Sequence, residues 1–340
     1  MLKKVKLEEA IGMTLGHDIT KVIPGKFKGP GFSRGHVIRQ EDIPELLSMG
    51  KKHVYIMELE EEEVHEEEAA LRIAKAICGA GLEISVPKEG RVNLKAKAPG
   101  LLKVNASLLK EINSLGEIVV VTAHSNTTCH AGMVVASTKI IPLFTTEAKV
   151  SEVEKICRGA NKIIEVIPIN QKRIGVVITG NEVFEGIIED KFGEVIRSKA
   201  EALGASINHQ VIVPDDVDLI AQGLAEVKAK GSEVIVVCGG LSVDPDDVTL
   251  EGVKKSGAQI VSYGAPVMPG AMFLVAMWDN IPILGTPAAV IYNPTTILDL
   301  ILPRVLAGEK IGRGDIIELG YGGLCLNCKK CSFPVCPFGK

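Results

Sequence analysis

Hydrophobic and polar residues alternate in regular blocks from about residue 172 onward. Apolar runs predict buried strands at 173–179, 208–213 and 233–237. The stretches between and after them predict helices at 191–203, from Asp215 or Asp216 to Gly231, and at 247–256. Strands that alternate with helices of this length are typical of βαβ units. The pattern therefore predicts an α/β fold in which a parallel sheet lies between two layers of helices.

The first 165 residues have a different texture, because short β-like runs are mixed with isolated helices. We expect a helix from Glu60 to Cys78, where acidic residues precede an apolar face and Gly79 follows it. The glycine-rich stretch 25–35 is expected to be a loop between strands, and 118–122 and 133–136 are expected to be strands. The predicted organisation is an N-terminal α+β region at 1–165, an α/β domain at 170–310 and a cysteine-rich tail at 315–340.

Glycines, hydroxyl groups and acids follow three of the predicted strands. Residues 179–182 (Thr-Gly-Asn-Glu) follow the first strand, 215–216 (Asp-Asp) the second, and the run 239–249 the third. In parallel sheets ligands bind outside the carboxyl ends of the strands, where backbone amides favour anions such as phosphate. Carboxylates beside a phosphate are suited to holding Mg²⁺. The alternative is that these acids are helix caps and these glycines form turns.

These motifs resemble the MoeA/MogA/gephyrin group of molybdenum-cofactor biosynthesis proteins. The family's Thr-Gly-Asp-Glu-Leu turn is similar to residues 179–183, and its Gly-Gly-Val-Ser-Val-Gly-x-x-Asp is similar to residues 239–247. Its helix-starting Asp resembles Asp190, its Asp-Asp resembles residues 215–216, its Pro-Gly-Lys-Pro resembles 269–272, and its Gly-Leu-Pro-Gly-Asn-Pro resembles 285–290. Residues 7–19 also resemble the family's opening Leu-x-x-Ala-x-Gly-x-x-Leu-Ala-x-Asp.

The resemblance implies a three-layer α/β domain that binds molybdopterin, free or adenylylated. The ligand-binding residues that it implies are Thr179, Gly180, Asp190, Gly239, Gly240, Leu241, Ser242, Pro269, Gly270, Gly285, Thr286 and Pro287. It also implies that Glu182, Asp215 and Asp247 are catalytic acids, which bind Mg²⁺ during insertion of molybdate or tungstate and release of AMP. A bulky side chain at Gly240 is then expected to abolish pterin binding and to leave the fold intact.

Some positions depart from the family pattern. Val267 and Ala271 replace two lysines, Ala288 and Ala289 replace a Gly-Asn pair, and Phe192 replaces an Asn. Loss of two cations weakens an anion site. The acids favour an enzyme, whereas these substitutions favour a carrier or sensor that holds molybdopterin or the finished cofactor without catalysis. Both hypotheses stay open from the sequence.

The last 16 residues contain four of the eight cysteines, in the pattern Cys325-x2-Cys328-x2-Cys331-x4-Cys336-Pro337. Such spacing lets successive thiolates turn toward one metal centre. The run has one more residue before its last cysteine than the bacterial ferredoxin pattern, and its pairs are closer together than those of a zinc ribbon. An iron–sulfur cluster, Zn²⁺ or a tail without metal are the three alternatives. The other cysteines, Cys78, Cys129, Cys157 and Cys238, are expected to be buried small hydrophobic residues, and Cys129-His130 is expected to belong to an ordinary loop.

Composition narrows the function classes further. A net charge of -4 and an aromatic content of 4% argue against nucleic acid as a partner. Apolar runs such as 272–278 are far shorter than the roughly 20 residues of a bilayer span, so we expect no membrane segment. We therefore expect a cytoplasmic homo-oligomer without disulfides. Its expected macromolecular partner is a molybdoenzyme or another cofactor-assembly protein.

Overall fold

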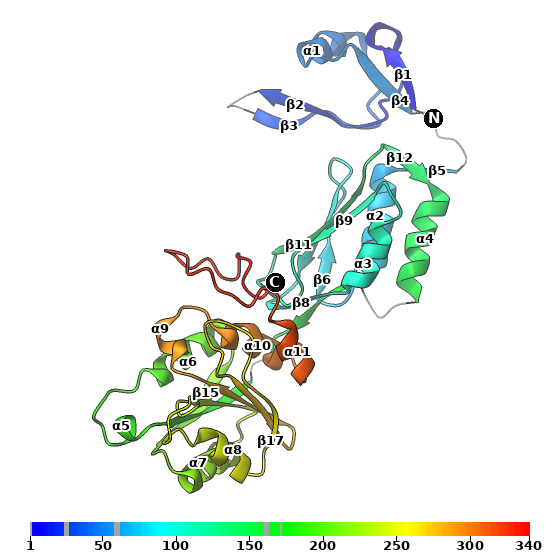
Figure 1. Cartoon of the computed structure of the whole chain (residues 1–340). Coiled ribbons are helices and arrows are strands. Elements are labelled where there is room, and N and C mark those ends of the chain that lie inside the picture. The colour runs from blue at the N-terminus through cyan, green and yellow to red at the C-terminus, as the bar shows by residue number, and fades with distance from the viewer. Residues whose placement is uncertain (1, 24–26, 58–61, 160–162, 171) are drawn as a thin grey trace. The chain divides into compact units, whose positions relative to one another are not determined.

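The computed structural model describes residues 2–23, 27–57, 62–159, 163–170 and 172–340 (Figure 1). The chain forms two compact units. The first contains Met1–Lys95, Val104–Thr122 and Met133–Glu165, and the second contains Ala96–Lys103, Ala123–Gly132 and Val166–Lys340.

The second unit is built on a six-stranded sheet with the order β15–β14–β16–β19–β18–β17. Its strands are Arg173–Thr179 (β14), Ser206–Val213 (β15), Val234–Cys238 (β16), Gln259–Tyr263 (β17), Leu274–Trp278 (β18) and Ile281–Thr286 (β19). β14 pairs in parallel with β15 and β16, and β16 pairs in parallel with β19. β18 is antiparallel to both of its neighbours. The predicted strands and their parallel pairing are confirmed, and β18 is an antiparallel insertion that the pattern did not indicate.

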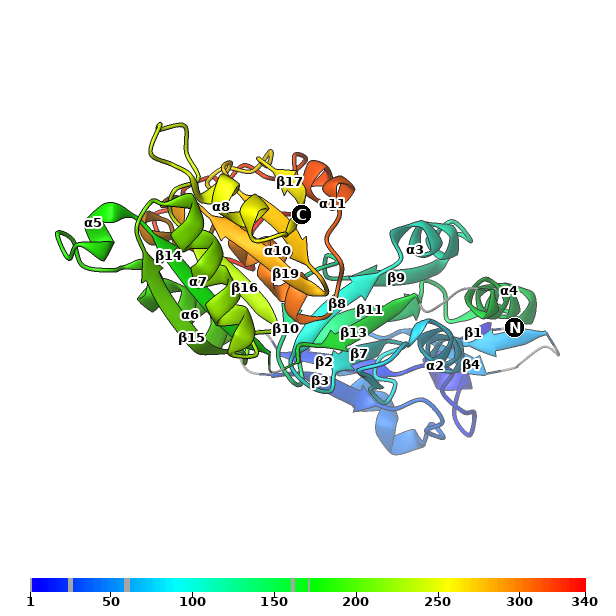
Figure 2. The same cartoon turned by 90° about the horizontal axis from the view of Figure 1, so that it is seen from below.

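Helices cover both faces of this sheet. The longer ones are Phe192–Ala202 (α6), Val217–Ala229 (α7), Thr249–Lys255 (α8) and Ile297–Leu306 (α10). Three short helices are Asn181–Phe184 (α5), Ala289–Tyr292 (α9) and Arg313–Glu318 (α11). Figure 2 shows α7 and α8 together on one face.

Alternate residues of the central strands enter two separate cores. On β14, Ile174, Val176 and Ile178 belong to the core that α6 and α10 complete. Val177 belongs to the core that α7 and α8 complete. Each fully buried aliphatic side chain contributes about 1.5–3 kcal/mol, so both helical layers are fixed to the sheet. The three-layer α/β architecture is confirmed.

The remaining strands form small sheets. A three-stranded sheet with the order β10–β8–β13 contains Gly100–Val104 (β8), Thr128–Cys129 (β10) and Ile164–Pro168 (β13). In the first unit, β6–β7–β11–β9 form a four-stranded sheet, and β1–β4, β2–β3 and β12–β5 form pairs. These strands are Leu2–Lys6 (β1), Ile19–Ile23 (β2), Phe27–Phe32 (β3), His53–Met57 (β4), Glu63–His65 (β5), Leu82–Ile84 (β6), Val92–Ala96 (β7), Ile118–Thr122 (β9), Val134–Ile140 (β11) and Phe144–Thr146 (β12).

The helices of the first unit are Ile43–Ser48 (α1), Glu66–Ile77 (α2), Ala106–Asn113 (α3) and Glu147–Arg158 (α4), with 3-10 turns at Leu7–Glu9 and Gln40–Asp42. α2 packs against α4 and β11. Helices and antiparallel strands together make this unit α+β, as expected. In the described parts of the chain, no helix is both long and apolar enough to cross a bilayer.

Two local predictions for this unit are wrong. The helix expected from Glu60 begins at Glu66, because Glu63–His65 pairs with β12 and the His65 ring accepts a hydrogen bond from the Glu67 N–H at the helix start. The loop expected at 25–35 contains β3, because β2 supplies backbone partners along 27–32. Gly25, Lys26, Glu60 and Glu61 lie outside the described residues.

Candidate functional site

The carboxyl ends of four neighbouring strands lie at one edge of the six-stranded sheet. Thr179 of β14 pairs with Val213 of β15, and Cys238 of β16 pairs with Thr286 of β19. β18 runs in the opposite direction, with Leu274 beside Gly285, so the segment that precedes it reaches the same edge. The fold thereby brings together the segments 179–182, 213–216, 239–247, 269–270 and 285–287.

Asn181 and Asp215 connect the ends of β14 and β15. The Asn181 N–H donates to Asp215 Oδ2 at 2.9 Å, and the Asp215 N–H donates to Asn181 Oδ1 at 3.1 Å. The other carboxylate oxygen of Asp215, Oδ1, is buried and has no hydrogen-bond partner among the described residues. A buried acceptor without a donor costs about 1–3 kcal/mol, which a bound cation would offset.

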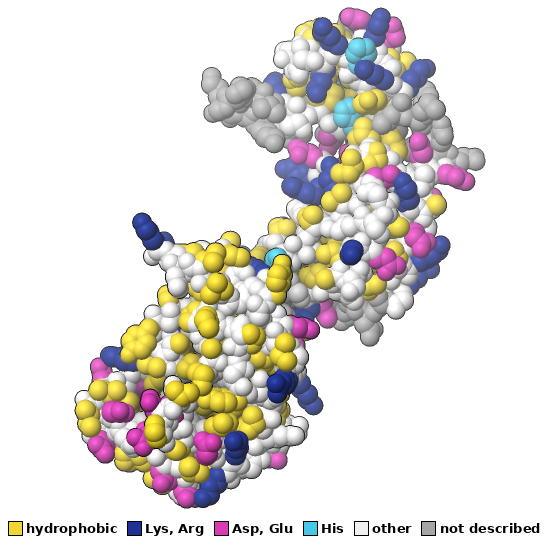
Figure 3. All heavy atoms as spheres, viewed as in Figure 1, with side chains coloured by type: hydrophobic (Ala, Val, Ile, Leu, Met, Phe, Trp, Pro, Cys, Tyr) yellow, Lys and Arg dark blue, Asp and Glu magenta, His cyan; other side chains and the backbone are white. Residues whose placement is uncertain are grey.

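The negative charges of three further acids affect the pKa of Asp215. Burial raises the pKa of Asp215, the Asn181 N–H lowers it, and the negative charges of Glu182, Asp247 and Asp246 raise it again. Figure 3 shows acidic side chains gathered around the end of this unit that carries α5. Within the described residues no three such side chains converge as a ready-made metal site. The arrangement is an acidic patch in which Asp215 holds the most constrained carboxylate.

Asp247 organises the loop that follows β16. Its Oδ2 accepts a hydrogen bond from the Ser242 N–H at 2.9 Å, so the carboxylate closes the loop 242–247. The Tyr263 hydroxyl donates to Leu241 O at 2.7 Å, and burial, followed by the charge of Asp247, raises the pKa of this tyrosine. Tyr263 therefore lies beside the start of the same loop.

The glycines of this loop are enclosed by protein. Thr179 is 3% exposed, and its hydroxyl lies 2.9 Å from that of Thr249. A Cβ on Gly240, which has a φ of +58°, would overlap the Thr249 hydroxyl, and a Cβ on Gly239 would overlap Thr179 O. The expectation that a bulky residue at Gly240 leaves the fold intact is therefore wrong. These glycines are required first by the backbone and by packing.

The segments 269–270 and 285–287 are also partly enclosed. A Cβ on Gly270, at φ +113°, would lie 2.8 Å from Ile297 Cγ2, and one on Gly285 would lie 2.8 Å from Leu241 and from Leu274. Thr286 is fully buried, and its hydroxyl has no partner among the described residues. Pro269 and Pro287 are half-buried, so they are the members of these segments that reach the surface.

Asp190 lies at the start of α6. Its Oδ1 accepts from the Phe192 N–H at 2.7 Å, and its Oδ2 accepts from the Gly193 N–H at 3.1 Å and from the Gln210 amide at 3.2 Å. Both carboxylate oxygens are engaged within the protein. Asp190 thus fixes the beginning of α6, as a helix-capping acid does.

Residues 175–306, which include this edge of the sheet, match the profile of a family described as a probable molybdopterin binding domain. They form a domain of that family. Residues 4–58 match a second family, which is described as a domain of unknown function.

Curated relatives match a short part of the chain. The CinA-like protein of Desulfosudis oleivorans is 36% identical over 81 residues, which are 24% of this chain and 19% of that protein. The CinA-like protein of Mycobacterium tuberculosis is 36% identical over 83 residues, again 24% of this chain and 19% of that protein. The match spans about a fifth of the length of such relatives.

Solved structures show more distant similarity. The tungsten cofactor synthesizing protein MoaB from Pyrococcus furiosus is 19% identical, with 40% of this chain and 96% of that chain covered and a TM-score of 0.33. The molybdopterin biosynthesis MoeA protein from Pyrococcus horikosii is 13% identical, with 90% and 75% covered and a TM-score of 0.34.

Two departures of the molybdopterin-binding domain from the family pattern lie in its core. Val267 is 1% exposed and Phe192 is 8% exposed, and both belong to the core that α6 and α10 complete. Apolar residues at these positions are explained by packing. Ala288 is exposed, so its methyl group lies at the surface beside β19.

Asn181, Thr249 and Tyr263 contribute to this edge of the molybdopterin-binding domain but were not predicted as site residues. Asn181 and Thr249 stand inside the two motifs that the sequence singled out, so their position was a usable signal. Tyr263 comes from β17, which is separated from β16 by two other strands in the sheet. No local pattern links it to the loop after β16.

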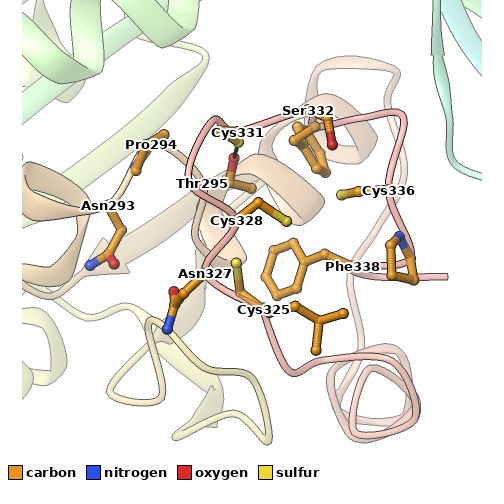
Figure 4. Close-up of a pocket in the computed structure, with 13 residues that line it drawn as sticks. Asn293, Pro294, Thr295, Cys325, Asn327, Cys328, Cys331, Ser332, Cys336 and Phe338 are labelled. Carbon is orange, nitrogen blue, oxygen red and sulfur yellow. Dashed lines mark hydrogen bonds between the residues drawn. The ribbon is translucent and has the colours of Figure 1, made fainter.

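The cysteines fall into two groups. Cys129 and Cys238 are buried, as expected, while Cys78 and Cys157 are half-buried. Burial raises the pKa of Cys129 to about 11, and His130 is exposed with its ring beside Ala131 O, so these two residues form no catalytic pair. The four tail cysteines, Cys325, Cys328, Cys331 and Cys336, line one cavity of about 160 Å³ with Thr295 and Phe338 (Figure 4).

Proposed function

We propose that the molybdopterin-binding domain binds molybdopterin, free or adenylylated, at the carboxyl edge of its sheet. The ligand would extend across the ends of β14, β16 and β19 and the segment before β18. Family membership supports the ligand class, and the convergence of the separate motifs at one edge supports the position. In this proposal Thr179, the loop glycines and Asp190 act by shaping the backbone, whereas Ser242, Pro269 and Pro287, which reach the surface, would contact the ligand.

We further propose that the acidic patch holds Mg²⁺ while molybdate or tungstate is inserted and AMP is released. The observation that carries this proposal is the buried Asp215 Oδ1, which has no hydrogen-bond partner in the described part of the chain and lies near the charges of Glu182 and Asp247. Mg²⁺ is usually held by one or two carboxylates, waters and substrate phosphates, so three converging acids are not needed. The ion would offset the negative charge that accumulates between the patch and the phosphate. Asp215 holds a fixed oxygen, and the exposed Glu182 is free to approach.

The second candidate is a non-catalytic carrier or sensor of molybdopterin. Ala271 favours it because it replaces a lysine of the family pattern and so removes a cation. Ala288 favours it because it replaces a glycine and so adds a side chain where the backbone could approach the ligand. In either role we propose a cytoplasmic homo-oligomer that delivers its ligand to a molybdoenzyme or a cofactor-assembly protein.

Release of AMP from adenylylated molybdopterin, with molybdate and Mg²⁺, distinguishes the two candidates. An insertase should release AMP, and Asp215→Asn, Asp247→Asn and Glu182→Gln should lose turnover far more than ligand affinity, since amides coordinate hard cations poorly. Asp279→Asn is the matched control. Asp279 pairs with Lys228 in the turn between β18 and β19, at the opposite edge of the sheet.

Full AMP release in all three acid variants would show that these acids are structural. Ligand binding without AMP release in the native protein would support the carrier instead. No binding of either form of molybdopterin would overturn both candidates.

A further inference from the structure

The tail is anchored at both ends. The Cys325 N–H donates to Met268 O and the Met268 N–H donates to Gly323 O, both at 2.8 Å. At the other end, Phe338 is 3% exposed and belongs to the core that α6 and α10 complete. The Gly339 N–H also donates to Gly322 O at 2.9 Å, so the two ends of the tail lie side by side.

Between these anchors Phe333 and Cys336 pack against the core that α6 and α10 complete, but the other residues have little to hold them. Residues 326–335 contain no helix or strand, and Leu326 and Val335 are 67% and 82% exposed. A segment of this kind buries too little apolar surface to offset the entropy of ordering its backbone. A group that cross-links its side chains would supply that stability.

The side chains that could be cross-linked are the four cysteines. Figure 4 shows the sulfur atoms of Cys325, Cys328 and Cys336 directed toward one cavity, with Cys331 turned toward Thr295. The Cys331 sulfur lies 3.3 Å from the Thr295 hydroxyl. Among the described residues no three of these thiols already lie close enough together to hold a metal. Binding therefore requires the exposed Cys328 and Cys331 to move toward Cys325 and Cys336.

The spacing of the cysteines favours a cluster over a single zinc ion. The run Cys325-x2-Cys328-x2-Cys331-x4-Cys336-Pro337 differs from the bacterial ferredoxin pattern by one residue before its last cysteine. A zinc ribbon separates its two cysteine pairs by more residues than this tail does. Lys329 and Lys330 stand between two of these cysteines, where their charges offset those of the thiolates.

We propose that Cys325, Cys328, Cys331 and Cys336 bind one iron–sulfur cluster in this cavity, and that the cluster fixes the tail against Met268 beside Pro269 and Gly270. All four thiols lose their protons when the cluster binds. The proposal concerns the tail itself and does not depend on what the sheet edge binds.

The test uses the full chain, purified without oxygen. We expect a brown protein with roughly two or four iron atoms per chain and an equal amount of acid-labile sulfide. The double variant Cys328→Ser/Cys331→Ser should lose nearly all of both and should be colourless. Because both cysteines are exposed, its fold should persist. Cys157→Ser, a half-buried cysteine of the first unit, is the matched control and should keep the iron.

Hydrogen exchange supplies a second readout. The amides of Met268 and Cys325 should exchange faster in the double variant than in the native protein, while those of β14 and β16 should be unchanged. A colourless native protein with one equivalent of zinc would overturn the proposal. Absence of both metals, with all four thiols titratable, would also overturn it, as would iron retained in full by the double variant.

Discussion

Single residues determine the chemistry at the edge of the molybdopterin-binding domain, and Asp215 shows this most directly. One carboxylate oxygen accepts a hydrogen bond from the Asn181 N–H, while the other is buried and has no partner among the residues that the structure describes. The fold therefore leaves part of the negative charge of Asp215 without a donor, as we expect if this oxygen binds the proposed Mg²⁺.

The raised pKa of Asp215 predicts a pH-dependent stability. The folded protein holds this proton more tightly than the unfolded chain, so the stabilising contribution is full below the ordinary value of 3.8 and is lost as pH rises through the raised pKa. In metal-free protein at pH 7, Asp215→Asn should therefore raise Tm. Because Asp215 is half-buried, we expect about 1 kcal/mol, or roughly 2–4 °C.

With Mg²⁺ the native protein should have the higher Tm of the two, since the ion stabilises the folded state through the Asp215 carboxylate and binds the amide of Asp215→Asn poorly. Thermal unfolding near pH 4 and at pH 7, with and without Mg²⁺, measures both effects. The gain from the substitution should disappear near pH 4. Equal Tm values for the two proteins under all four conditions would contradict the role given to Asp215.

Gly240 and Thr249 form a second pair whose energetics can be measured. Gly240→Ala should lower stability by about 1–3 kcal/mol, because the new methyl group overlaps the Thr249 hydroxyl and the backbone has a positive φ. Thr249→Ala in the same chain should recover the part due to overlap. The two substitutions should thus be less destabilising together than their sum, as urea unfolding of the double-mutant cycle would show. Strictly additive losses would mean that the two residues do not meet.

At the scale of elements, similar acids near helix starts make different contacts. Asp216 caps α7, with its Oδ1 accepting from the Asp218 and Leu219 N–H groups, while its neighbour Asp215 turns to Asn181. From the sequence alone, either Asp215 or Asp216 could be the cap of α7. The cap could not be identified locally, because successive side chains in extended backbone point to opposite sides and the partner of Asp215 lies in α5, which is distant in the sequence.

Substitutions of Asp190 separate a capping role at α6 from a role in ligand binding. Asp190→Ala should destabilise the protein by about 1 kcal/mol through loss of the cap of α6, whereas Asp190→Asn should keep both the cap and molybdopterin affinity. Urea midpoints and ligand titration of the two variants separate the roles. A stable Asn variant that has lost affinity would mean that the carboxylate itself contacts ligand.

Strand partners explain what the pattern of single elements missed. Residues 63–65 become a strand because β12, which is distant in the sequence, lies beside them, and residues 27–32 become a strand because they pair with the preceding β2 despite their glycines. In the central strands β14 and β16 of the six-stranded sheet the apolar runs are buried on both faces, so periodicity and length were enough. β18 was not indicated because a buried antiparallel strand has the same apolar composition as a parallel one.

At the scale of the whole molecule, the sequence predicted which segments meet and not how they are used. The parallel order of β14, β15, β16 and β19 follows from alternating elements, and it alone brings Glu182, Asp215 and Asp247 to one edge. The unpaired Oδ1, the enclosed glycines and Tyr263 depend on side-chain packing between strands distant in sequence. The cysteine spacing indicated a metal centre, while the shared cavity and its anchors are visible only in the fold.

The position of Phe338 also affects when the domain can finish folding during synthesis. The core that contains Ile174, Val176 and Ile178 receives this ring from beyond α11, whose Ile316 also belongs to the core. A growing chain that has released α11 from the ribosome would still expose the apolar surface of the core that Phe338 covers. Domains fold as units as they emerge, and incomplete ones are prone to aggregate. The domain therefore completes this core, and becomes less prone to aggregate, only after the segment 325–338 has left the ribosome.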